Sequence, residues 1–394
     1  MDLTRYAMGG IAPAAAACPA DNAAAAEAMR ACAAAGEALL PWGGGVALAH
    51  ESAPGRYDRA LDLRAMNGML TYEPDDFTLT AQCGITVAAL RETLAARGQE
   101  LPIEAAHADR ATLGGVLAAN ASGARRLRFG APRDRILGAR FVTGDGTLAR
   151  TGGRVVKNVA GHAVHRLLVG SRGGLGVLLE ASLKLLPLPP ARAALVHGAD
   201  AALLADGARW AEFPRRECAA LSVLGAEIAP PALRAHAAPF SVVTGFEDDA
   251  TWVASCVAFA HEQLGAPAAH RGGAELPALW QALADLEETP GARLTFTSAH
   301  NTPDAIAVLA DRDVAKRLVF HAPHGRLHLW PRPQDAAALV AELAPRGFRL
   351  IDARGVAVTR AASVAGVTRL RERLRDALDP ARVMALGERW QQGA

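Results

Sequence analysis

Residues 157–180 read KNVAGHAVHRLLVGSRGGLGVLLE, and the second half of this stretch is rich in glycine. A dinucleotide fingerprint needs G-x-G-x-x-G between a strand and a helix. Gly174 and Gly176 supply the first pair of glycines, but position 179 is Leu. A Walker-type phosphate loop needs Gly-Lys-Ser/Thr, whereas Lys157 lies before the glycines. Neither common nucleotide loop explains these residues.

Two further glycine-rich stretches lie earlier in the chain, PWGGGVA at 41–47 and TLGGVLAANASG at 112–123. Each lies at the end of an apolar strand or at the start of a helix. Glycine lets a backbone come close to a ligand and present its N–H groups. The first stretch contains no Lys or Arg, so backbone dipoles would hold an anion there. The three stretches together predict a long ligand with a diphosphate; the alternative is that the glycines only make tight turns.

Length and charge bound the possibilities further. A chain of 394 residues predicts two domains. The formal net charge is +2, and because no block of like charge stands out, nucleic acid is not an expected partner. The cluster of Arg125, Arg126 and Arg128 is interpreted as a local contact with an anion or a partner, with a solvated loop as the alternative.

The five cysteines are scattered and form no C-x-x-C pair. This pattern excludes an ordinary cysteine-ligated iron–sulfur or zinc site within the chain, and it fits a reducing compartment. The alanine-rich N-terminus is a poor signal peptide because Asp2, Gly9, Gly10 and Pro13 interrupt it. No window of about 18 apolar residues is free of charge. We therefore expect a cytoplasmic protein without a membrane span.

The pattern of helices and strands predicts an α+β fold. Helices are expected over 21–36 and 87–97, and a hairpin over 136–150. The segment LPLPP at 186–190 is the clearest boundary, and short strands and helices mix after it. The tail at 367–390 is predicted to be an amphipathic helix that ends at Asp379-Pro380.

The three glycine-rich stretches and their flanks resemble the FAD-binding domain of the p-cresol methylhydroxylase and vanillyl-alcohol oxidase superfamily. The resemblance covers residues 20–190 strongly and continues weakly to the C-terminus. VVKNVAGHAVHRLLVGS at 155–171, followed by GGLGV, is most similar to the FAD-binding E-type subunits of glycolate oxidases. The resemblance implies an FAD-binding domain of p-cresol methylhydroxylase type at 1–190, built from two subdomains. It also implies a cap or substrate-side domain at 191–394, an antiparallel sheet with helices on one face, whose C-terminal tail returns to the FAD lobe.

The resemblance further implies that the first stretch holds the pyrophosphate and that the third offers backbone groups to the flavin. The residues that it implies for binding FAD are Trp42, Gly43, Gly44, Gly45, Val46, Ala47, Pro102, Thr112, Leu113, Gly114, Gly115, Ala119, Asn120, Ser122, Gly123, Asn158, Gly161, Gly176 and Val177. Relatives with covalent flavin carry a His near the first loop or a Cys further on. Here no His occurs before His50, so non-covalent FAD is expected.

The sequence does not identify the catalytic base, and its candidates are weak. Related D-2-hydroxy-acid dehydrogenases carry H-x-x-G-D-G-N-L-H, whose outer histidines bind a metal; the chain keeps those two histidines but lacks the Asp and the Asn. Two histidines alone make a poor divalent site, so no metal is expected. An arginine could hold a substrate carboxylate through two parallel hydrogen bonds. Family members usually carry Tyr where this chain has His162. The candidates are His162, Arg293, His321, Arg326 and His328.

Three functions follow from the resemblance. The first is an FAD-dependent oxidoreductase subunit that acts on CH–OH groups and oxidises glycolate to glyoxylate. Its implied partners are a D-type flavoprotein and an iron–sulfur F-type subunit, because the chain has no cysteine cluster to carry electrons away; any membrane association would come through these partners. The second is a structural or electron-relay subunit that binds FAD without turnover. The third is a stand-alone FAD oxidase of another hydroxy acid or sugar.

Overall fold

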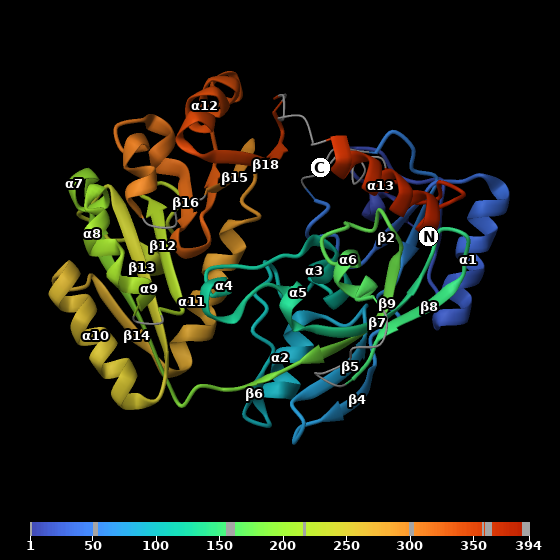
Figure 1. The fold of residues 1–394 in the computed structure, drawn as a ribbon, viewed down its shortest axis with the longest axis horizontal. Helices are drawn as coiled ribbons and strands as arrows, with labels where there is room; N and C mark the ends of the chain where they lie inside the picture. The colour runs from blue at the N-terminus through green and yellow to red at the C-terminus, as the bar shows by residue number, and fades with distance from the viewer. Residues whose placement is uncertain are drawn as a thin grey trace. The chain divides into compact units, whose positions relative to one another are not determined.

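The computed structural model describes residues 2–49, 54–154, 162–215, 218–298, 303–356, 358 and 365–387. These residues form two compact units (Figure 1). The first unit contains residues up to 121, residues 131–188 and the tail from 362 onward; the second contains residues 122–130 and 189–361. The chain therefore enters the second unit twice.

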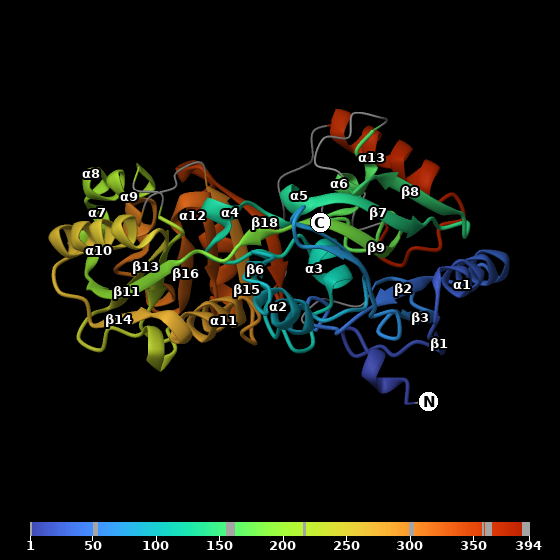
Figure 2. The same cartoon turned by 90° about the horizontal axis from the view of Figure 1, so that it is seen from below.

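A small parallel sheet in the first unit leads to the first glycine loop. Its strands β1 (Ala15–Ala17), β2 (Leu39–Trp42) and β3 (Arg59–Asp62) lie in the order β1-β3-β2. Figure 2 shows them beside α1 (Asn22–Ala35). The Asp21 carboxylate caps α1 by accepting from the Ala24 N–H at 2.8 Å, and Gly36 ends it at φ 63°. This confirms the predicted helix.

A larger antiparallel sheet forms the rest of the first unit. Its strands, in spatial order, are β4 (Met69–Glu73), β5 (Thr78–Gln82), β9 (Val177–Lys184), β7 (Ile136–Val142) and β8 (Leu148–Gly152). The β7–β8 hairpin confirms the predicted turn, which passes through Gly146 at φ 80°. The other described elements are η1 (Thr4–Tyr6), α2 (Val87–Ala95), β6 (Gln99–Glu100), α3 (Leu113–Ala119), α5 (Pro132–Arg135), α6 (Val164–Leu168), β10 (Leu186–Pro187) and α13 (Ala365–Leu378). Apolar residues of α2, α3 and α6 share one core with the sheet.

The C-terminal tail pairs with the strand that leads to the first glycine loop. The Leu39 N–H donates to the Val383 carbonyl at 2.7 Å, and the Ala385 N–H donates back to Leu39 at 2.9 Å. Asp379, which follows α13, is fully buried and accepts from the Val383 N–H at 2.7 Å. β2 is therefore held by β3 on one edge and by the tail on the other.

The second unit is built on an antiparallel sheet. In spatial order its eight strands are β14 (Ala269–Gly272), β11 (Ala191–Ala199), β13 (Phe240–Asp248), β12 (Ala220–Gly225), β16 (Leu318–His321), β17 (Arg326–Leu329), β15 (Arg293–Ser298) and β18 (Phe348–Arg354). The described helices and turns of this unit are α4 (Arg126–Phe129), α7 (Ala201–Ala205), α8 (Gly207–Trp210), α9 (Glu212–Arg215), η2 (Pro231–Leu233), α10 (Ala250–Leu264), η3 (Gly273–Glu275), α11 (Leu276–Leu286), η4 (Pro303–Leu309), η5 (Asp313–Arg317), η6 (Ala322–His324), η7 (Pro333–Asp335), α12 (Ala336–Leu343) and η8 (Ala344–Arg346).

Helices cover both faces of this sheet, so the expectation of helices on one face is wrong. Successive residues of the central strands alternate between two cores: Leu195 and Val242 belong to one, and Val196 and Val243 to the other. The first core includes residues of α10 and α12, and the second includes α11. Strands that are apolar on both faces require cover on both. Among the described helices, none has the length and apolar character needed to cross a bilayer.

The segment 122–130 is anchored in the second unit by a buried ion pair. The Arg125 guanidinium lies 2.7 Å from a carboxylate oxygen of Glu247, and the two side chains are 8% and 0% exposed. The guanidinium also lies 4.6 Å from the centre of the Phe129 ring. This segment was expected in the FAD-binding domain at 1–190, but it belongs to the second unit. Its arginine cluster was expected to contact an anion or a partner, or to form a solvated loop, whereas Arg125 pairs with Glu247 within the chain.

Replacing Arg125 with Met should leave the Glu247 carboxylate buried without its counter-charge. We expect the free energy of unfolding of the second unit to fall by about 3–5 kcal/mol, as for other broken buried pairs. The matched control is Arg128→Met, because Arg128 pairs with the partly exposed Asp248 and should cost about 1 kcal/mol or less. Urea unfolding measures both variants, and equal losses would contradict the assignment.

Candidate functional site

The first glycine loop lies against the main chain of Arg110, just before the second loop, and against the side chain of Thr112 at its start. A Cβ on Gly44 would overlap the carbonyl oxygen of Arg110, and a Cβ on Gly43 would overlap the Thr112 hydroxyl. Both residues must therefore be glycine, whatever binds beside them. Gly45 follows at φ 73°, and a Cβ there would lie 3.0 Å from the Trp42 indole. The alternative that these glycines serve tight packing of the chain is thus correct in part.

The second loop begins α3 and is fixed at its start. The Thr112 hydroxyl caps α3 by accepting from the Gly115 N–H at 3.3 Å. The Gly114 N–H donates to the Cys83 carbonyl at 2.7 Å, and a Cβ on Gly114 would lie 2.9 Å from the Cys83 side chain. The main chain at the start of α3 therefore packs directly against Cys83, the residue that follows β5.

The third loop closes the arrangement. The Gly170 N–H donates to Leu117 at 3.0 Å, and the Arg172 N–H donates to Ala118 at 2.8 Å. Gly173, at φ 75°, would bring a Cβ to 3.1 Å from Pro41, just before the first loop. Each of the three loops therefore contacts the other two, within the first unit.

This convergence fits an extended, polar cofactor such as FAD. Residues 43–47 are only partly buried and Gly115 is exposed, so main chain without large side chains faces accessible space. Asn120 ends α3 in the left-handed region at φ 50°. Its side-chain oxygen is buried and, within the described residues, accepts no hydrogen bond. A buried acceptor of this kind indicates a missing donor.

The other residues expected to bind FAD are distributed less evenly. Pro102, Leu113 and Val177 are buried, so only the main chain of Val177 could face a ligand. Val46 is partly buried against the core of the first unit, and Ala47 and Ala119 are partly exposed. A Cβ added to Gly176 would lie 3.0 Å from the Val142 carbonyl oxygen. Ser122 and Gly123 lie in the second unit; Asn158, Gly161 and His50 lie outside the described residues.

A second polar cluster lies on the sheet of the second unit. His321 on β16 and His328 on β17 face each other with ring centres 6.1 Å apart. Each ring is held by a hydroxyl on the neighbouring strand: His321 Nδ1 lies 2.8 Å from Ser222 Oγ, and His328 Nδ1 lies 3.1 Å from Thr295 Oγ1. These contacts orient both Nε2 atoms toward the same place.

Glu287, directly after α11, completes this cluster. Its Oε1 lies 3.7 Å from His321 Nε2, and the three ligand atoms of Glu287, His321 and His328 lie within 4.8 Å of one another. All three atoms are buried, and none has a hydrogen-bond partner in the described part of the chain. Sequence spacing did not reveal Glu287, because the fold alone brings it to the two strands. The expectation of no metal was made without this carboxylate.

Burial sets the charge state of the cluster. It lowers the pKa of His321 from 6.5 to about 3, with a contribution from the Arg326 charge, and it lowers the pKa of His328 well below 6.5. Burial also raises the pKa of Glu287. Neutral imidazoles whose Nδ1 atoms contact hydroxyls can present Nε2 lone pairs. Two imidazoles and a carboxylate are a ligand set that could hold a divalent cation.

The remaining catalytic candidates do not form one group. Arg293 is buried and lies 3.7 Å from Asp352, beside the Arg354–Glu288 pair at 2.8 Å. Arg326 is half-buried and pairs in register with His321. His162 is exposed and belongs to the first unit, whereas the other four candidates belong to the second. The structure therefore brings together His321, Arg326 and His328, and the charge of Arg293 also contributes to the lowered pKa of His328.

Comparison with known proteins gives a family match that lies mostly in the first unit. Residues 13–152 match the family model of the FAD binding domain. This part of the chain is therefore similar to FAD-binding domains. The match includes the first two glycine loops and ends before the third, which the geometry adds to the same site.

Two of the curated relatives are subunits of glycolate oxidases. Glycolate oxidase subunit GlcE of Escherichia coli (strain K12) is 44% identical over 138 residues, 35% of this chain and 39% of the relative. Glycolate oxidase subunit GlcD of Bacillus subtilis (strain 168) is 32% identical over 158 residues, 40% of this chain and 34% of the relative. The chain thus spans about two fifths or less of the length of these curated relatives.

One solved structure matches nearly the whole chain. An alkyldihydroxyacetonephosphate synthase superposes with a TM-score of 0.69 at 17% identity, covering 98% of this chain and 78% of that chain. The similarity shows a shared fold of mixed helices and sheets. It confirms the predicted fold class.

Substituting Ala for Gly44 should test the loop contact. The new methyl group would overlap the Arg110 carbonyl, so the first loop must move. Overpacking of this kind costs about 1–3 kcal/mol, and we expect the Kd for FAD to rise about tenfold or more. The control is Gly55→Ala, because a Cβ there meets no atom within 4 Å. Titration of apoprotein with FAD, followed by flavin fluorescence, measures both. Unchanged affinity in Gly44→Ala would refute the contact.

The pKa of His321 predicts a pH dependence of stability. Between pH 6.5 and about 3 the unfolded chain binds a proton at His321 that the folded chain does not, so the free energy of unfolding falls as the pH falls. At pH 5 this loss should be about 2 kcal/mol for His321 alone. In His321→Gln, the free energy of unfolding should therefore fall less between pH 7 and pH 5 than it does in wild type, by this amount.

Urea unfolding with a chelator present measures this difference, and exposed His236 provides the control His236→Gln. An equal loss of stability in wild type and His321→Gln would show that His321 is not neutral in the folded chain. Adding zinc without chelator gives a second reading: a stabilisation seen in wild type and absent in His321→Gln would show that the cluster holds a cation.

Proposed function

We propose that the chain is the FAD-binding subunit of a glycolate oxidase and oxidises glycolate to glyoxylate. The observation that carries the proposal is the convergence of three glycine loops in a chain of which 138 residues are 44% identical to a glycolate oxidase subunit. The relatives GlcE and GlcD are named as subunits, which supports a multi-subunit assembly with a hydroxy acid as substrate.

The chain's own residues would hold FAD without a covalent bond. Main-chain N–H groups of residues 43–46 would contact the diphosphate, Gly114 and Gly115 would line the rest of the cofactor, and Asn120 would accept a hydrogen bond from it. FAD, when bound, supplies the two-electron acceptor for oxidation of an alcohol. The protein's contribution is to fix that acceptor and to exclude water from it.

The buried cluster of the second unit would handle the polar groups of the substrate. The positive charge of Arg326 beside two neutral imidazoles suits a carboxylate. His321 and His328 could each accept a proton at Nε2, but a pKa of about 3 for His321 makes it a weak base in the unliganded chain. We therefore propose that the main role of the cluster is to bind the substrate. The catalytic base would be either His321 or His328.

Electrons must leave the chain through a partner. The five cysteines lie apart in the sequence, and four of them are buried, which provides no cysteine-ligated cluster. We propose a D-type flavoprotein subunit and an iron–sulfur F-type subunit as the partners. The free thiols suit a cytoplasmic complex.

A second candidate function is an electron-relay or structural subunit. The observation that favours it is the stretch His321 to His328, which contains neither the Asp nor the Asn of the dehydrogenase motif. In that case the chain would bind FAD and leave substrate oxidation to its partner.

Anaerobic addition of glycolate to the FAD-loaded chain separates the two. We expect loss of the visible flavin absorbance with glycolate and none with ethylene glycol, which lacks the carboxylate. A yellow protein that glycolate leaves unchanged, alone and with an artificial acceptor, would support the relay. Bleaching by another hydroxy acid or a sugar instead would indicate a different substrate.

The role of Arg326 can be tested in the same assay. Loss of one charged hydrogen bond to a carboxylate costs about 1.5–3 kcal/mol, so Arg326→Met should raise KM for glycolate about tenfold or more. Arg332→Met is the control, since Arg332 is exposed and pairs with Asp313 at 3.1 Å. Equal KM values would exclude Arg326 from substrate binding.

A further inference from the structure

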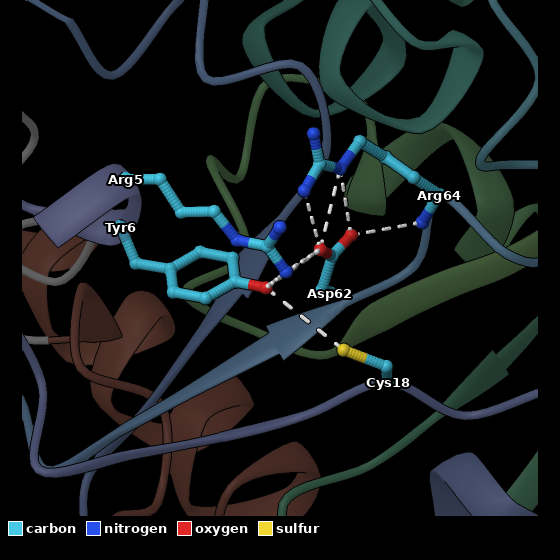
Figure 3. Close-up of polar contacts among 5 residues, drawn as sticks. All are labelled: Arg5, Tyr6, Cys18, Asp62 and Arg64. Carbon is cyan, nitrogen blue, oxygen red and sulfur yellow. Dashed lines mark hydrogen bonds and ion pairs between the residues drawn. The ribbon is translucent and has the colours of Figure 1, made fainter. Parts of the chain in front are cut away.

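The N-terminal segment is fastened beside the first glycine loop by one buried tyrosine. Tyr6, the last residue of η1, has no exposed surface. Its hydroxyl donates to Asp62 Oδ2 at 2.8 Å (Figure 3). Its carbonyl oxygen accepts from the Tyr57 hydroxyl at 2.9 Å. Both ends of the residue are therefore held, one through the side chain and one through the main chain.

The acceptor for Tyr6 is itself held in place. Asp62 ends β3, and the Arg64 guanidinium donates to both of its carboxylate oxygens, at 2.7 Å to Oδ2 and 3.0 Å to Oδ1. The Arg64 N–H adds a third bond at 3.1 Å. Figure 3 shows Arg64 and Tyr6 approaching the Asp62 carboxylate together. A buried carboxylate with this many donors has a fixed orientation, so the Tyr6 hydroxyl has a fixed partner.

The Tyr6 ring connects this network to the first loop. It meets the Trp42 indole edge to face, with ring centres 5.6 Å apart and planes at 90°. The indole in turn lies directly beside Gly45, because a Cβ added to this glycine would be only 3.0 Å from the indole ring. Trp42 and Asp62 are paired in the β2–β3 ladder. The contacts thus run without a gap from Tyr6 through Trp42 to Gly45.

We propose that Tyr6 is a positioning residue for the cofactor. Its ring holds the Trp42 indole in one orientation, and the indole holds the first glycine loop in its binding conformation. Without the ring, the indole gains rotational freedom and the loop must be ordered again at each binding event, which lowers affinity. The proposal rests on the FAD-binding domain and does not depend on the substrate.

Two substitutions at position 6 separate the ring from the hydroxyl. An edge-to-face pair contributes about 0.5–1.5 kcal/mol, so Tyr6→Leu should raise the Kd for FAD up to about tenfold and change the visible circular dichroism of the bound flavin. Tyr6→Phe keeps the ring and should keep both affinity and spectrum, although it loses the bond to Asp62 and is less stable.

The control for general destabilisation is Met8→Ala. Met8 is 1% exposed and lies in the same apolar cluster as Tyr6 and Trp42, and its truncation should lower stability while leaving the Kd for FAD unchanged. The proposal is overturned if Tyr6→Leu binds FAD like wild type, or if Met8→Ala loses as much affinity. A wild-type chain that binds no FAD overturns it as well. Absence of glycolate oxidation with normal FAD binding refutes only the proposed function.

A measurement on the unaltered chain serves if Tyr6→Leu does not fold. The amide of Tyr6 donates to the Leu3 carbonyl at 3.1 Å. Because coupling between two sites is reciprocal, saturating FAD should slow hydrogen exchange at this amide. The amides of β13, in the second unit, provide the reference. Exchange at Tyr6 that is indifferent to FAD would contradict the proposal.

Discussion

The carbonyl group of Arg110 occupies the space that a side chain at position 44 would need, and the cofactor site depends on this main-chain contact. The first loop can come this close to Arg110 and to the Thr112 side chain only because positions 43 and 44 carry no side chain. The third loop then binds the C-terminal end of α3, where the N–H groups of Gly170 and Arg172 donate to the carbonyl groups of Leu117 and Ala118. The result is a surface made of backbone, which suits a diphosphate better than mobile lysines would.

The two units treat polarity in opposite ways. The first unit leaves backbone partly accessible around its loops and buries few charges there. The second unit buries Glu287, Arg293 and three histidines near one end of its sheet, at a cost in desolvation. Burying so many ionisable groups without full pairing is unfavourable for folding alone, and such clusters are typical of functional sites.

Local signals in the sequence predicted the helix over 21–36, the hairpin after β7 and the three loops, because caps, turns and glycines act over short distances. They did not predict that helices cover both faces of the large sheet, or that residues 122–130 join the second unit. Glu287 was missed for the same reason: 34 residues separate it from His321, and only the register of the strands brings it there. The contact between Tyr6 and Trp42 likewise had no local pattern.

The double entry of the chain into the second unit constrains how such proteins can be recombined. Replacement of residues 189–361 alone would exchange β11 to β18 but keep the native 122–130 segment. The incoming sheet would then have to present a carboxylate where Glu247 stands, or bury a guanidinium without a counter-charge. Exchange of the second unit among related chains therefore requires two coordinated replacements, one of them only nine residues long.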